Sequence, residues 1–175
     1  MTRSARTLCV VLFLASPAMA MEVEEIGTLQ TTFDGESFTL PTVLATRDKE
    51  RSPTAYLFRP GAGFSHLTVS SHSPGNPRVF VEVDYFAETP GRDSAPHFVA
   101  ITYYPPGTRQ HWTSEEAPTP PSVTFTTLDV EGEEGRAVGT FEALLCFAED
   151  YGADADLDNC RTIEGSFDTR IFVEE

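Results

Sequence analysis

RVFVEVDY, residues 78–85, alternates apolar and polar side chains along most of its length. In an extended chain, one face of this stretch carries four apolar side chains: Val79, Val81, Val83 and Tyr85. Glu82 and Asp84 fall on the opposite face. A period of two residues is typical of a β-strand with one side toward a core and the other toward water.

Segments of the same kind recur along the chain, bounded by Gly, Pro, Asp and Asn, and no stretch has a sustained 3.6-residue apolar period. The pattern therefore predicts an all-β protein. The predicted strands are residues 25–33, 37–46, 54–59, 64–71, 78–86, 97–104, 123–130, 136–147 and 162–173.

About eight or nine strands separated by short turns predict either two packed antiparallel sheets or a closed barrel. We favour the antiparallel β-sandwich, because the long connections at 87–96 and 105–121 are easier to place between sheets. The barrel is the alternative. The chain length fits a single all-β domain over residues 21–175.

The first twenty residues have the pattern of a Sec-type signal peptide, with two arginines, the apolar run LCVVLFLA and the ending SPAMA. We expect cleavage after Ala20 and a periplasmic or secreted location. The apolar run is far shorter than the roughly 20 residues that cross a bilayer, so no membrane insertion is expected.

The chain is strongly acidic, with a formal net charge of −15 at pH 7. Nucleic-acid backbones and anionic lipid surfaces should repel it. The partners that remain are a protein, a peptide or a glycan.

Export leaves two cysteines, Cys146 and Cys160, and an oxidising compartment favours joining them. In the last two predicted strands they alternate with the apolar residues, which include Phe141 and Leu145, and so fall on the opposite, polar face. We therefore predict a disulfide in the C-terminal hairpin, on its polar side.

Placing the cysteines opposite each other fixes the register of this hairpin. Each of two phenylalanines then covers a glycine, in the pairs Phe141–Gly165 and Gly139–Phe167. The same register sets Glu142 against Glu164, which is unfavourable. A one-residue slip would turn the apolar set toward water, so we keep the register.

The loop between the cysteines is acidic and suggests a calcium site. Asp154, Asp156 and Asp158 have a D-x-D-x-D spacing that resembles the first half of an EF-hand loop, and Asp150 could join them. The twelfth position is Gly165, not glutamate, so the EF-hand itself is rejected. A looser calcium site is one prediction, and a solvated acidic loop is the other.

The segment 103–121 holds the only tryptophan, Trp112, with Tyr104, Arg109 and His111 close by. Aromatic rings with polar neighbours on a long loop indicate a ligand-binding site. The alternative is that Trp112 folds back to cover an edge of the sandwich.

No catalytic motif is visible, and the four histidines lack zinc-ligand spacing. We therefore predict an exported, non-enzymatic protein with a binding or structural role and no cofactor other than calcium. The alternatives are a calcium-stabilised structural domain using the 150–158 loop, and a hydrolase with an unrecognised site.

Overall fold

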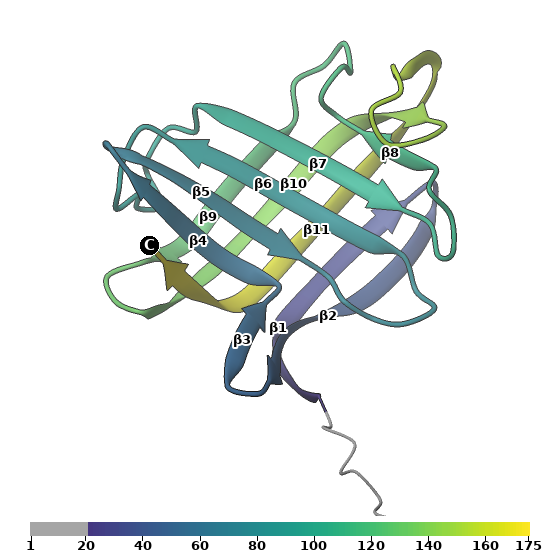
Figure 1. Cartoon of the computed structure of the whole chain (residues 1–175). Coiled ribbons are helices and arrows are strands. Elements are labelled where there is room, and N and C mark those ends of the chain that lie inside the picture. Colours follow the sequence, from purple (N-terminus) through teal and green to yellow (C-terminus); the bar gives the residue numbers. More distant parts are fainter. Residues whose placement is uncertain (1–20) are drawn as a thin grey trace, which may run out of the picture.

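The computed structural model describes residues 21–175, and the predicted signal peptide, residues 1–20, lies outside them. Every regular element in the described residues is a β-strand, so the all-β prediction is confirmed. The strands, labelled in Figure 1, are β1 (Glu22–Phe33), β2 (Glu36–Arg47), β3 (Glu50–Pro53), β4 (Ala55–Gly61), β5 (Phe64–Ser70), β6 (Arg78–Tyr85), β7 (Phe98–Tyr104), β8 (His111–Thr113), β9 (Ser122–Asp129), β10 (Glu134–Ala148) and β11 (Asp156–Glu174).

The nine strands predicted from the alternation are all present, although β11 begins at Asp156, earlier than the predicted residue 162. Strands β3 and β8 were not predicted. They have four and three residues, which is too short for a two-residue period to be recognised. Strand β8 lies within the connection at 105–121 that the sequence presented as irregular.

The strands form one mixed sheet in the order β3-β2-β1-β11-β4-β5-β6-β7-β8-β10-β9, and β10 also pairs with β11. That second pairing closes the strands from β11 to β10 into a ring. All neighbours are antiparallel except β11 and β4, which run parallel. Strands β4 to β7 cross in front of β10, β11, β1 and β2 (Figure 1), so the two layers belong to one folded sheet.

The core lies between these layers and contains the apolar face of β6. Val79 and Val83 are 0% exposed, and Tyr85 is 1% exposed. Burying one such aliphatic side chain stabilises the fold by about 1.5–3 kcal/mol. The opposite parity of β6 leaves Glu82 and Asp84 half-buried on the outer surface of the sheet.

The C-terminal hairpin has the predicted register. Cys146 pairs with Cys160 and Phe141 pairs with Gly165, and the disulfide joins the two cysteines. A Cβ at Gly165 would lie 2.4 Å from Cζ of Phe141, so the ring occupies the space that a side chain at 165 would need. The predicted opposition of Glu142 and Glu164 is also present.

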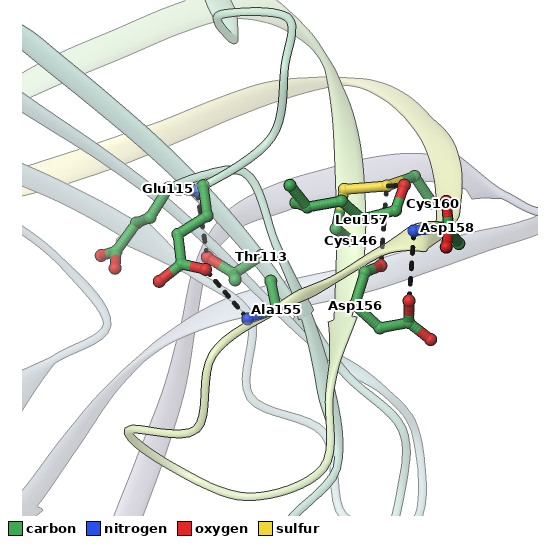
Figure 2. Close-up of a disulfide and its surroundings, with 9 residues drawn as sticks. Thr113, Glu115, Cys146, Ala155, Asp156, Leu157, Asp158 and Cys160 are labelled. Atoms are coloured by element: carbon green, nitrogen blue, oxygen red, sulfur yellow. Dashed lines mark hydrogen bonds between the residues drawn. A yellow bond between two sulfur atoms is a disulfide. The ribbon is translucent and has the colours of Figure 1, made fainter.

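The environment of the disulfide differs from the prediction, because Cys146 is fully buried. The pairing skips from Cys160 to Asp156, so the intervening residues bulge out of β11. Figure 2 shows Leu157 in this bulge beside the disulfide, and its carbonyl oxygen lies 3.3 Å from Sγ of Cys160. The bulge and the neighbouring strand β8 shield Cys146 from water, although the alternation along β10 places this residue on the polar face.

Candidate functional site beside strands β7 and β8

Two of the predicted binding residues, Tyr104 and His111, meet on the outer surface of the sheet. Strands β7 and β8 pair antiparallel, with Tyr103 opposite Trp112. The Tyr104 and His111 rings stack with their centroids 5.1 Å apart and their planes 25° apart. His111 is only 7% exposed, and both residues lie on paired strands, so the two rings are held in place by the sheet.

Trp112 follows His111 on β8 and therefore points to the other side of the sheet. Its ring packs in edge-on contact with Phe33 and Phe147, at centroid distances of 5.4 and 5.1 Å. It belongs to the layer of half-buried side chains against the core. The structure therefore separates Trp112 from Tyr104 and His111 and packs it against the core, from a strand that lies between β7 and β10 and not at an edge of the sheet.

The loop after β10 folds over the outside of β7 and β8. The backbone N–H of Ala155 donates to Oε2 of Glu116 at 2.9 Å, one of the dashed contacts in Figure 2. At the outer rim, Nη1 of Arg109 lies 3.9 Å from Oδ2 of Asp150. The Arg109 side chain is 86% exposed, so this ion pair is worth little by itself.

Between this loop and the sheet lies a hollow of about 510 Å³, which we call the acidic hollow. It brings Tyr104 and His111 together with Asp154, which the sequence had assigned to a separate calcium site. Its lining consists of Phe80, Glu82, Thr102, Tyr104, His111, Thr113, Glu115, Glu116, Tyr151, Gly152, Ala153 and Asp154. Four carboxylates, two tyrosines, a phenylalanine and a histidine thus share one site.

The surroundings of Glu82 in this site disfavour its ionised form. Burial raises the pKa of Glu82 above its ordinary value, the nearby His66 opposes this increase, and the charges of Glu115 and Asp84 add to it. Burial also raises the pKa of the Tyr104 hydroxyl; Tyr151, Glu82 and Glu115 add to this increase, and the charge of Arg78 opposes it. The hollow therefore concentrates negative charge, which His66 and Arg78 beside it compensate only in part.

Behind Glu82 lies a hydrogen-bonded group centred on His66. Its Nδ1 is 2.6 Å from Oδ1 of Asp84, and its Nε2 is 3.0 Å from the Thr68 hydroxyl and 3.7 Å from Oε1 of Glu82. A hydroxyl, an imidazole and a carboxylate in series have the connectivity of a nucleophilic triad. Thr68 is only 3% exposed, however, so its hydroxyl is shielded from a substrate.

The predicted calcium ligands have local partners in the structure. Oδ1 of Asp156 accepts the N–H of Asp158 at 3.1 Å (Figure 2), and Oδ1 of Asp150 accepts the N–H of Tyr151 at 2.8 Å. Within residues 21–175, no three or more His, Cys, Asp or Glu side chains gather in a way that could hold a metal ion. Calcium binding stays a prediction.

Glu82, Glu115 and Glu116 are site residues that the sequence pattern does not indicate. The alternation in β6 did place Glu82 on the outer surface, but nothing in the sequence indicated that the loop after β10 would fold over it. The pairings of β6 with β7, of β7 with β8 and of β8 with β10 bring these segments together.

Comparisons with known proteins add no further information about this site. A scan against protein-family models and searches of curated proteins and of solved structures give no match to the chain. Nowhere in residues 21–175 is there a helix with the length and apolar character needed to cross a membrane.

Proposed function

We propose that this protein is an exported binding protein, and that its acidic hollow receives a positively charged group of a partner. The observation that carries the proposal is the chemistry of the lining. Ionised carboxylates accept hydrogen bonds and donate none. Glu82, Glu115, Glu116 and Asp154 therefore present acceptors, and the aromatic rings beside them present faces that attract cations.

His111 supports the same conclusion. Within residues 21–175, the His111 ring makes one hydrogen bond, between its Nδ1 and the carbonyl oxygen of Arg109 at 3.3 Å. A carbonyl oxygen can only accept, so Nδ1 carries the hydrogen, and in the neutral ring Nε2 is then an acceptor. A ring that is nine-tenths buried thus leaves an acceptor without a partner in the lining of the hollow.

The overall charge favours such a partner. A formal net charge of −15 attracts cationic ligands from a distance and repels anionic ones. The local repulsion between Glu82 and Glu115 would also be relieved by a bound cation. Export is part of the proposal and is supported by the N-terminal pattern and by a disulfide of the kind that persists in oxidising compartments.

The test is calorimetric titration of residues 21–175 with a short peptide of alternating glycine and basic residues, at low and at physiological salt. We expect binding that weakens at least tenfold in Glu82→Gln/Glu115→Gln. The matched control is Glu142→Gln/Glu164→Gln, which removes the same charge from another part of the sheet surface. Equal losses in both variants, or no binding to the wild-type chain, would overturn the proposal.

A further inference from the structure

We propose that the positively charged group received by the acidic hollow is a guanidinium, carried by an arginine side chain or by free arginine. This inference rests on the proposed function and narrows it from cations in general to one planar cation.

The rings of the hollow supply flat surfaces. Tyr104 stacks on His111, and Phe80 meets Tyr104 edge-on with the centroids 5.7 Å apart and the planes 77° apart. A guanidinium is planar and stacks on such faces, whereas an ammonium is a compact charge that gains less from a flat partner. The ring arrangement therefore favours arginine over lysine.

The partial burial of Glu82 also favours arginine over lysine. The side chain of Glu82 is only 35% exposed, so a cation that reaches it loses part of its water. A guanidinium is more weakly hydrated than an ammonium and loses less on transfer. Its parallel N–H groups can also meet one carboxylate in two bonds at once.

The acceptors around the hollow come from separate parts of the chain. Glu82 lies on β6, His111 on β8, Glu115 just after β8, and Asp154 in the loop after β10. A guanidinium has five N–H donors spread around its plane and no acceptor, whereas an ammonium has three donors. The larger number of donors matches a lining that offers acceptors from several sides.

This protein already holds arginines in the way that we propose. Cζ of Arg51 lies 4.4 Å from the centroid of the Phe172 ring, while its Nη2 lies 2.8 Å from Oε1 of Glu134. Phe172 and Glu134 are paired across β11 and β10, whereas Phe80 and Glu82 both lie on β6, beside Tyr104 on β7. At the hollow itself, Cζ of Arg78 lies 4.9 Å from the centroid of Phe80, so an arginine of the chain already covers one face of this ring.

The experiment compares capped arginine, Nα-acetyl-arginine methylamide, with the matching capped lysine, by calorimetry on residues 21–175. We expect the arginine compound to bind at least tenfold more tightly. Equal or tighter lysine binding would overturn the guanidinium inference and leave the proposed function standing. If neither compound binds at millimolar concentration and the basic peptide also fails, both proposals fall.

A ring variant tests the reason for the preference. Tyr104→Leu removes the ring that stacks on His111, and we expect the arginine-over-lysine ratio to fall roughly tenfold, toward one. The control is Tyr56→Leu, which changes a half-buried tyrosine of β4 outside the hollow and should leave the ratio unchanged. An unchanged ratio in Tyr104→Leu would contradict the inference. Free arginine and a Gly-Arg-Gly peptide, titrated in parallel, separate the small molecule from a protein segment as its source.

Discussion

Replacing Gly165 with alanine tests how the C-terminal hairpin is packed against β1. A Cβ at this position would lie 2.3 Å from the carbonyl oxygen of Gln30 and 2.4 Å from Cζ of Phe141. The first neighbour is backbone in the ladder between β1 and β11, and the second belongs to a ring that is 3% exposed. Neither neighbour can retreat unless a strand moves.

The expected cost follows from these contacts. Overpacking a close-packed interior destabilises a protein by about 1–3 kcal/mol, and two immobile neighbours place this site near the upper end. Alanine recovers about 0.5–1 kcal/mol relative to glycine, because glycine loses more freedom on folding. The free energy of unfolding of Gly165→Ala should therefore fall by about 2 kcal/mol, which lowers Tm by about 4–8 °C for a chain of this size.

Urea unfolding followed by circular dichroism measures this change, with Gly91→Ala as the matched control. A Cβ at Gly91 would have no atom within 4 Å, so we expect a change within about 0.5 kcal/mol there. If Gly165→Ala is as stable as Gly91→Ala, then Phe141 does not occupy the space above Gly165, and β10 and β11 do not pair in the register that sets these two residues opposite each other.

Four further predictions concern the cysteines, the hollow, the core edge and the loop. Replacing Cys146 and Cys160 together with alanine should lower the free energy of unfolding by about 3 kcal/mol, because the bridge closes a loop with a sequence separation of 14; a loss below about 1 kcal/mol in urea unfolding would contradict this. Glu82→Gln should stabilise the protein at neutral pH, since a folded-state pKa above the ordinary 4.5 means that ionised Glu82 opposes folding. That gain should shrink as the pH falls from the raised pKa toward 4.5 and vanish below it; a gain that grows on acidification would show the opposite sign. Trp112→Ala should cost about 3 kcal/mol, at the lower end for a buried aromatic ring, yet leave binding at the acidic hollow intact; lost binding at unchanged stability would place Trp112 in the site instead. If the 150–158 loop binds calcium, then calcium should raise Tm in the wild-type chain but not in Asp156→Asn, and a wild-type Tm that is constant up to millimolar calcium would exclude this role.

The hairpin of β10 and β11 shows how much of the fold could be predicted from the sequence. The alternation of apolar residues and the pairing of the two cysteines allow one register that keeps Phe141 in the core. This register also places Glu142 directly across from Glu164. The like-charge cost of about 1 kcal/mol or less is smaller than that of exposing a row of apolar side chains. Local pattern and one covalent link were therefore sufficient.

The acidic hollow shows what could not be predicted. Because 105–121 has no strand-like alternation, the sequence predicts that Tyr104, His111 and Trp112 share one loop surface. Strand β8 is long enough to place His111 and Trp112 on opposite sides of the sheet, but too short to be recognised by alternation. The contacts that complete the hollow join residues far apart in the chain, such as Glu116 and Ala155, and no local pattern encodes them.

Chemical-shift mapping reports directly on whether the acidic hollow is the binding site. Isotope-labelled protein, residues 21–175, is titrated with the Gly-Arg-Gly peptide while the amide and aromatic signals are followed. We predict that the largest shifts occur at Tyr104, His111, Glu115 and residues 151–154, and that signals around Glu142 and Glu164 stay in place. Shifts spread evenly over the acidic surface, or concentrated away from β7 and β8, would contradict the proposal.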